Sequence, residues 1–279
     1  LIKKEFSKYN INYSFAEGSS LKHFKRCIRE NTKGIYIETP SNPLLKIVDM
    51  KALSDFAKSN NLWTMIDNTF ASPINQNPIS FGIDIVIHSA TKYLGGHSDI
   101  SAGAVIASKK HIEKVYDLAK SLGGTISEFS AWLLERSIKT LPIRVREQNK
   151  NALELAYYLE NHSKISKVYY PGLVSHKDHE IAKKQMSGFG GMLSIEVSSK
   201  IDPKLFLKNL KIIKPVMSLA GVESTANYPK LTSHSSLSQK ERNDQGISDK
   251  LIRLSAGIES IEDLKNDINN ALKISSNES

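Results

Sequence analysis

Lys92 stands at the end of an apolar run in the segment DIVIHSATKYLGGHSD, beside hydroxyl side chains and glycines. Ser89 and Thr91 precede it, and Gly95 and Gly96 follow it. A lone lysine is usually a surface residue, but a lysine at the end of a buried strand can have the lowered pKa that a nucleophilic amine needs. The hydroxyl groups could donate hydrogen bonds to a phosphate, and the glycines would allow a close backbone approach to a ligand.

Asp67 ends another apolar run, LWTMID, one strand earlier in the chain. An aspartate in this place often only caps a turn or a helix. Together with Lys92 it indicates pyridoxal 5′-phosphate (PLP) chemistry, which needs a carboxylate to keep the pyridine nitrogen of the cofactor protonated. We therefore expect Lys92 and Asp67 to meet at one cofactor.

Two further segments carry candidate binding residues. The loop ETPSNP, at residues 38–43, follows a predicted strand and includes Asn42, at the edge where parallel sheets bind ligands. It could equally be a plain turn. Arg253 lies inside the apolar run LIRLSAG, where a guanidinium needs an anionic partner. The spacing leaves a structural salt bridge and a substrate carboxylate equally open.

The elements that must position these residues follow from the apolar patterns. β-branched runs at residues 34–38, 62–67, 84–88 and 103–107 predict strands, and residues 49–58 predict a helix between the first two. This alternation predicts an α/β fold with a largely parallel, buried sheet.

A long helical pattern at residues 127–162, interrupted at Pro142, predicts a bridge between two domains. Trp132 and Leu133 in this pattern are expected in the core. Beyond it we expect strands at 191–197 and 251–255, and helices at 203–209 and 261–273. The predicted domains are residues 1–143, which would bind the cofactor, and residues 144–279, a smaller α/β domain.

Charge and composition argue against several kinds of partner. The net charge is +9, but the lysines are scattered among acidic residues, so no nucleic-acid partner is expected. No run of about twenty apolar residues is present, so no membrane span is expected and a cytoplasmic location is predicted. His176 and His179 have no cysteine or carboxylate set beside them, so we expect surface histidines and no metal site.

The ordered series of motifs resembles the transsulfuration (Cys/Met metabolism) family of PLP enzymes, which includes cystathionine β- and γ-lyases, cystathionine γ-synthase and methionine γ-lyase. The motifs are ETPSNP, DNTF, HSATKYLGGHSD, KTLPIR, KKQMSGFGGMLSIEV, SLAGVEST and GISDKLIRLSAGIE, and they cover nearly the whole chain. The resemblance implies a PLP-dependent transferase-like fold (aspartate aminotransferase-like, fold type I). Its mostly parallel sheet would have helices on both faces, and a smaller C-terminal α/β domain would follow.

The resemblance also implies a role for each site residue. Lys92 would be the Schiff-base lysine and general base, and Asp67 the partner of the pyridinium. Asn42 would lie near the phenolic oxygen of PLP and contribute to substrate binding. Further implied contacts are Ser89 and Thr91 to the phosphate, and Ser218 and Arg253 to the substrate carboxylate. The substrate would be a small sulfur amino acid, and the assembly a homotetramer built as a dimer of dimers with shared active sites.

The chain departs from the family pattern at two places. It begins at Leu1 and has no match to the family's N-terminal segment, which carries a glycine-rich phosphate loop, a Tyr-x-Arg pair and a tyrosine that stacks on PLP, so we expect an N-terminally truncated chain. Met217 stands at the position where the resemblance implies a glutamate in cystathionine γ-synthases and γ-lyases. An apolar side chain cannot pair with a distal ammonium, which favours a β-lyase or a methionine γ-lyase-like enzyme.

The expected function is therefore that of a PLP-dependent carbon–sulfur lyase that acts on cystathionine or a related sulfur amino acid. Two alternatives stay open. One is a γ-replacement enzyme, such as cystathionine γ-synthase or an O-acylhomoserine sulfhydrylase. The other is an incomplete, non-catalytic fragment.

Overall fold

The computed structural model describes residues 2–276 and contains two β-sheets. The strands are β1 (Gly34–Glu38), β2 (Trp63–Asp67), β3 (Ile85–Ser89), β4 (Gly103–Ala107), β5 (Ile165–Tyr169), β6 (Met192–Val197), β7 (Lys214–Pro215), β8 (Thr225–Asn227) and β9 (Leu251–Ser255). The first sheet has the order β1-β2-β3-β4, and the second has the order β5-β6-β9-β8-β7.

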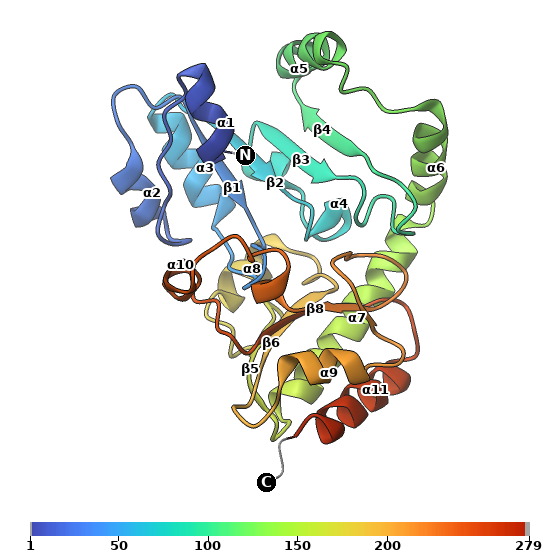
Figure 1. Ribbon diagram of the computed structural model, residues 1–279. Coiled ribbons are helices and arrows are strands. Elements are labelled where there is room, and N and C mark those ends of the chain that lie inside the picture. The colour runs from blue at the N-terminus through green and yellow to red at the C-terminus, as the bar shows by residue number, and fades with distance from the viewer. Residues whose placement is uncertain (1, 277–279) are drawn as a thin grey trace.

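Helices surround both sheets (Figure 1). The α-helices are α1 (Ile2–Glu5), α2 (Leu21–Cys27), α3 (Met50–Ser59), α4 (Ser72–Asn75), α5 (Lys109–Leu122), α6 (Glu128–Ile138), α7 (Leu141–Glu160), α8 (His179–Gln185), α9 (Pro203–Asn209), α10 (Gln239–Asp244) and α11 (Ile261–Ile274). Short 3-10 helices are η1 (Phe6–Tyr9), η2 (Pro78–Phe81) and η3 (Pro229–Leu231). None of the described helices is long and apolar enough to cross a membrane.

The first sheet forms because short β-branched runs bury one face against α3. Ile35, Ile37 and Ile66 of the strands share a cluster with Met50 and Leu53 of α3. Each such side chain contributes about 1.5–3 kcal/mol when it is fully buried. β1, β2 and β3 are parallel, as the sequence predicted. Their carboxyl ends therefore meet at one edge of the sheet.

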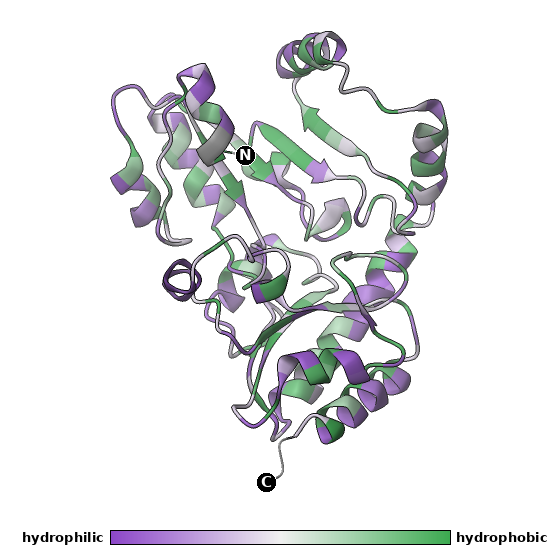
Figure 2. Ribbon diagram, viewed as in Figure 1, coloured by the Kyte–Doolittle hydropathy of each residue, from purple (hydrophilic) through white to green (hydrophobic). Residues whose placement is uncertain are grey.

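β4 departs from the expected parallel, buried sheet. It pairs antiparallel with β3. Its residues Val105 and Ile106 are exposed. An antiparallel edge strand needs no helical crossover, and it can leave one face open to solvent. Figure 2 shows this strand and its neighbour β3 as apolar ribbon.

The second sheet packs against α7 and the C-terminal helix. Leu193 and Ile195 of β6, with Leu254 of β9, lie in the largest buried cluster together with Leu155 of α7 and Ile268 of α11. α7 begins at Leu141, and Pro142 lies in its first turn, where a proline costs no helical hydrogen bond. The interruption predicted at Pro142 is confirmed, because α6 ends before it.

Two predictions about burial are wrong. Trp132 of α6 was expected in the core, but it is 58% exposed, and α5 has no buried residue at all. The helical spacing of apolar residues was correct, yet no described element covers that face. His176 was expected at the surface, but it is only 8% exposed, and burial lowers its pKa.

Candidate active site

The ends of three neighbouring strands bring acidic and hydroxyl side chains to one sheet edge. Glu38, the last residue of β1, pairs in register with Asp67, the last residue of β2. Asp67 pairs with Ile87 of β3, and Ser89 ends that strand. Residues from separate segments thus lie side by side at the carboxyl edge of the sheet, in the place that the sequence indicated.

Hydrogen bonds tie Asp67 to the strand that leads to the lysine. The Asp67 carboxylate accepts from the Thr69 amide at 2.9 Å. The Thr69 hydroxyl in turn accepts from the Ser89 amide at 2.8 Å. One carboxylate oxygen of Asp67 makes this turn contact, so the expected capping role and a role toward a ligand are compatible in the same side chain.

Lys92 lies in a tight turn directly after β3. Its amide donates to the Ser89 carbonyl at 3.0 Å, and its carbonyl accepts from the Gly96 amide at 2.6 Å. Within the described residues its side-chain amine has no hydrogen-bond or ion-pair partner. Burial lowers the pKa of Lys92, and the positive charge of Arg253 lowers it further. The amine is therefore more readily deprotonated than that of an ordinary lysine, as nucleophilic use requires.

The two hydroxyl groups beside Lys92 differ in their contacts. Thr91 pairs with Ala102: its hydroxyl donates to the Ala102 carbonyl at 3.3 Å and accepts from the Ala102 amide at 3.0 Å. The Ser89 hydroxyl has no hydrogen-bond partner among residues 2–276. Ser89 is thus free to donate to a phosphate, whereas Thr91 would have to give up its bond to Ala102.

The space beside the two glycines after Lys92 is occupied by side chains of the protein itself. Gly96 has a left-handed backbone (φ +69°), and a Cβ on it would collide with the Arg144 guanidinium. A Cβ on Gly95 would lie 2.9 Å from the Ile100 side chain. The close approach that the sequence suggested at Gly96 is made by Arg144, the last residue of the KTLPIR motif, which received no role from the sequence.

Arg253 is a buried guanidinium without a carboxylate partner among the described residues. It is 4% exposed, and burial lowers its pKa to about 10, so it stays charged at neutral pH. It donates to the Asn42 side-chain oxygen at 3.2 Å and to the Met217 carbonyl at 3.0 Å. A structural salt bridge, one of the two possibilities that the spacing left open, is thus not found in the part of the chain described. The other possibility, a substrate carboxylate, stays a prediction.

Asn42 links Arg253 to the sheet edge. The backbone amide of Asn42 donates to the Glu38 carboxylate at 2.8 Å. Desolvation by the surrounding protein raises the pKa of Glu38 to about 7, and the charge of Asp67 adds to the rise. Part of the Glu38 side chain is still exposed to solvent. Glu38 is a member of the site that the sequence motif contained but that received no role.

Ser218 lies in the loop Met217–Gly221 (MSLAG), next to the carbonyl that holds Arg253. The Ser218 carbonyl accepts from the Thr225 hydroxyl at 2.9 Å. The Met217 side chain is 60% exposed. Arg253 is therefore hydrogen-bonded to the residue that directly precedes Ser218. Met217 contributes its backbone carbonyl to the site, while its side chain extends into solvent.

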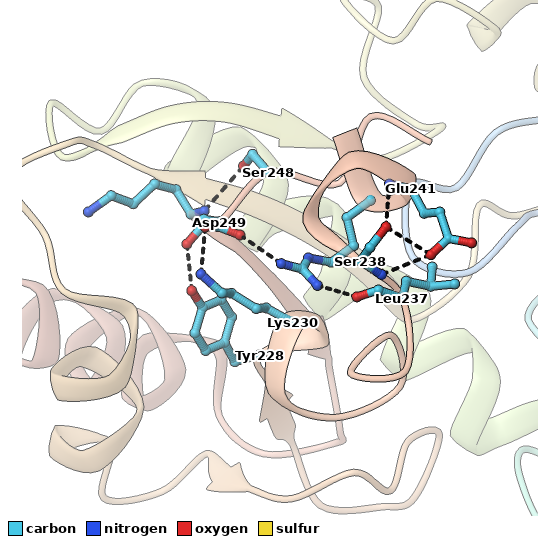
Figure 3. A network of polar contacts seen from close by, with 9 residues as sticks. Tyr228, Lys230, Leu237, Ser238, Glu241, Ser248 and Asp249 are labelled. Atoms are coloured by element: carbon cyan, nitrogen blue, oxygen red, sulfur yellow. Dashed lines mark hydrogen bonds and ion pairs between the residues drawn. The ribbon is translucent and has the colours of Figure 1, made fainter. Parts of the chain in front are cut away.

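A polar network links the two ends of the segment between β8 and β9 (Figure 3). Asp249 accepts from Lys230 at 2.5 Å and pairs with Arg242 at 3.7 Å. The Tyr228 hydroxyl donates to the Asp249 carbonyl at 2.7 Å. His234 lies in this segment, and burial together with the charge of Arg253 lowers its pKa. The network thus ties together the segment that contains His234, the residue whose pKa responds to the charge of Arg253.

The side chains gathered here fit PLP. Judged on residues 2–276, the set contains a lysine amine without a polar partner, a strand-end carboxylate, a free hydroxyl beside the lysine and a buried cation without an anion. A PLP enzyme needs a group of each of these kinds, for the aldehyde, the pyridine nitrogen, the phosphate and the substrate carboxylate respectively. No group of three or more metal-ligating side chains occurs among the residues described.

Comparisons with known proteins agree with this chemistry. The family described as "Cys/Met metabolism PLP-dependent enzyme" matches residues 1–273. Cystathionine beta-lyase of Lactococcus lactis subsp. cremoris (strain MG1363) is 47% identical over 98% of this chain and 72% of its own length. Cystathionine gamma-lyase of Bacillus subtilis (strain 168) is 44% identical over the same shares. The crystal structure of cystathionine gamma-lyase from Lactobacillus plantarum complexed with L-serine superposes with a TM-score of 0.95 at 38% identity, over 98% of this chain and 72% of that one.

Proposed function

Because this chain belongs to the Cys/Met metabolism PLP-dependent enzyme family, we propose that it is a carbon–sulfur lyase of sulfur amino-acid metabolism. Its cofactor is pyridoxal 5′-phosphate, and its substrates are small amino acids. The observation that carries the proposal is that the Lys92 amine lies within electrostatic reach of the buried Arg253 guanidinium, which has no carboxylate partner among the described residues. An amino-acid substrate presents the two groups that such a pair would handle, a carboxylate and an α-carbon proton.

We propose the following roles for the residues of the site. Lys92 holds the cofactor and afterwards takes the proton from the substrate Cα, since its lowered pKa favours the free amine. Asp67 keeps the pyridine nitrogen protonated. Bound PLP draws electron density away from Cα, so that the C–H bond can break and the carbon–sulfur bond can follow. Ser89 donates to the phosphate, with Thr91 as a second donor.

Substrate orientation is assigned to the loops around Arg253. Arg253 and Ser218 bind the substrate carboxylate, and Asn42 orients the guanidinium through its 3.2 Å hydrogen bond. Asn42 would also contact the phenolic oxygen of PLP when the cofactor is bound. The fork of a guanidinium matches the two oxygens of a carboxylate. Fixing the carboxylate in this way directs the Cα–H bond toward Lys92.

Met217 supports a substrate whose distal end carries no strict charge requirement. Its thioether cannot pair with an ammonium, and its exposed position leaves the distal end of the substrate near solvent. We therefore favour a β-lyase or a methionine γ-lyase-like activity over a γ-replacement activity.

The products of cystathionine cleavage test the proposal directly. β-Elimination releases pyruvate, ammonia and homocysteine, whereas γ-elimination releases 2-oxobutyrate, ammonia and cysteine. A γ-replacement enzyme instead consumes an activated homoserine and a thiol without forming a keto acid. We expect a keto acid and ammonia in equal amounts; replacement without keto acid would overturn the lyase assignment.

Exposed apolar side chains support assembly into a homo-oligomer. They lie on β4, α5 and α6, and exposed apolar patches of this kind usually mark a protein interface. We propose a second copy of the chain as the partner, and sedimentation equilibrium would measure the assembly. The side chains concerned are Val105, Ile106, Leu118, Leu122, Phe129 and Trp132.

A further inference from the structure

One face of α7 carries polar side chains where a buried helix face is normally apolar. Arg144, Gln148 and Asn151 follow one another at the spacing of four and then three residues that places them on the same face. Their exposed fractions are 4%, 0% and 1%. Figure 1 shows α7 running from the level of the first sheet down along the second.

Arg144 binds the backbone around the Lys92 turn. Its guanidinium donates to the Tyr93 carbonyl at 2.9 Å, to the Leu94 carbonyl at 3.4 Å and to the Ser137 carbonyl at 2.9 Å. Its Nε donates to the Thr140 hydroxyl at 3.1 Å. Gly96 has no Cβ that would displace it. All described acceptors of Arg144 are uncharged oxygens, so it holds chain segments in place rather than neutralising an acid.

Gln148, one turn further along, binds the loop that carries Ser218. Its amide donates to the Gly221 carbonyl at 2.6 Å. The next residue of that loop, Val222, donates its amide to the Gly96 carbonyl at 2.9 Å. The Ser98 hydroxyl adds a 2.6 Å bond to Glu223. The Lys92 turn and the Ser218 loop are therefore joined to each other as well as to α7.

Asn151 binds the segment that follows the strand of Arg253. Its side-chain amide donates to the Gly257 carbonyl at 3.1 Å and to the Glu259 carbonyl at 2.9 Å. Three polar positions on one face of α7 thus hold three segments: the turn that carries Lys92, the loop that carries Ser218, and the segment that directly follows the strand of Arg253.

We propose that Arg144, Gln148 and Asn151 are positioning residues that set the Lys92 turn in register with the two substrate-binding segments. The inference rests on the proposed roles of Lys92, Ser218 and Arg253. Arg144 binds the Lys92 turn and makes no hydrogen bond to the Ser218 loop, whereas Gln148 binds the Ser218 loop and makes none to the Lys92 turn, within the described residues. Loss of each should therefore impair a different step, which a general packing role would not do.

The test uses Arg144→Lys, which keeps the charge but loses the fork, and Gln148→Met, which keeps the length but loses the amide donor. Arg146→Lys, at an exposed position of the same helix, is the matched control. Hydrogen exchange is followed by mass spectrometry with and without PLP. We expect faster exchange in residues 92–98 for Arg144→Lys and in residues 218–224 for Gln148→Met, and no change for Arg146→Lys.

Steady-state kinetics provide the second readout. Arg144→Lys should lower kcat about tenfold with KM nearly unchanged, and Gln148→Met should raise KM about tenfold with kcat nearly unchanged, as the loss of one strong hydrogen bond implies. If both variants accelerate exchange throughout the protein, or change kcat and KM alike, the proposal is overturned. If one variant does not fold, the other decides alone, because each loop has its own anchor. Exchange without PLP is independent of the proposed function, which fails separately if the unaltered chain binds no PLP.

Discussion

Arg253 lies close enough to Lys92 for its positive charge to lower the pKa of the lysine amine. Lys92 lies in the turn after β3 of the first sheet, whereas Arg253 lies within β9 of the second sheet. Because Arg253 is buried and has no carboxylate partner among the described residues, neither solvent nor a nearby acid screens its charge from Lys92. A substrate carboxylate would neutralise Arg253, and the same event would raise the pKa of Lys92 and prepare it to accept a proton.

Removal of the Arg253 charge should raise the pKa of Lys92. We expect the pH midpoint for labelling of the Lys92 amine, measured in protein without PLP by reductive methylation and mass spectrometry, to move upward in Arg253→Gln. Arg253→Lys keeps the positive charge and is the matched control. Equal midpoints in the unaltered chain and in Arg253→Gln would contradict the electrostatic coupling.

The same substitution should weaken substrate binding. A hydrogen-bonded charge is worth about 1.5–3 kcal/mol, so Arg253→Gln should raise KM for α-amino acids by roughly 10- to 100-fold. Esterification of the substrate carboxylate should remove most of that difference, because the ester lacks the charge that Arg253 recognises. An equal preference for the free acid in both proteins would assign the substrate carboxylate to another residue.

Glu38 should make stability depend on pH. Its pKa is raised from 4.5 to about 7, so the folded state holds a proton that the unfolded chain releases. Its contribution is present below pH 4.5 and is lost as the pH rises through about 7. The Tm of Glu38→Gln relative to the unaltered chain should therefore increase between these pH values. Asp67→Asn should reduce that increase, because it removes a like charge. A level Tm difference would contradict the raised pKa of Glu38.

Asp249 should stabilise the segment between β8 and β9, which contains His234. Asp249→Asn weakens its ion pairs with Lys230 and the buried Arg242; because the Asp249 carboxylate is itself partly exposed, each pair is worth up to about 1 kcal/mol. We expect faster hydrogen exchange in residues 229–248 and a severalfold higher KM, with kcat retained. Asp244→Asn, at an exposed position of α10, is the control and should change neither quantity.

Met217→Glu should shift substrate preference. An exposed carboxylate at this position could pair with a distal ammonium, and exposed pairs contribute about 0.2–1 kcal/mol. The kcat/KM ratio for cystathionine over methionine should rise by roughly 1.5- to 5-fold, the factor that corresponds to this energy. Competition between the two substrates in one reaction measures the ratio. An unchanged ratio would remove Met217 from the specificity determinants.

The strands and the strand-end residues could be predicted because their signals are local. Apolar runs gave every strand of the first sheet to within one residue, and the placement of Asp67 and Lys92 at the carboxyl edge is confirmed. The antiparallel direction of β4 could not be predicted, because pairing direction depends on the route of the connecting loop. The domain boundary between residues 143 and 144, inside the first turn of α7, stays a prediction.

The contacts that orient the site could not be predicted for a different reason. Arg144 and Gln148 look like solvent-facing residues of an amphipathic helix, and only their shared face with buried Leu141 and Val145 signals otherwise. Trp132 was expected in the core because the apolar residues around it recur at helical spacing. That spacing predicts an apolar helix face but not which element packs against it. Long-range partners such as Asn42 and Arg253 meet only through the tertiary fold.

The absorbance spectrum of the purified chain mixed with PLP tests the central claim most directly. A visible band that borohydride abolishes, with the label on the peptide that contains Lys92, is the predicted result. Lys92→Ala should lack the band, and Lys46→Ala, at another partly buried lysine whose pKa is lowered, should keep it. A band that persists in Lys92→Ala, or a label on a different lysine, would contradict the assignment of Lys92 as the residue that holds the cofactor.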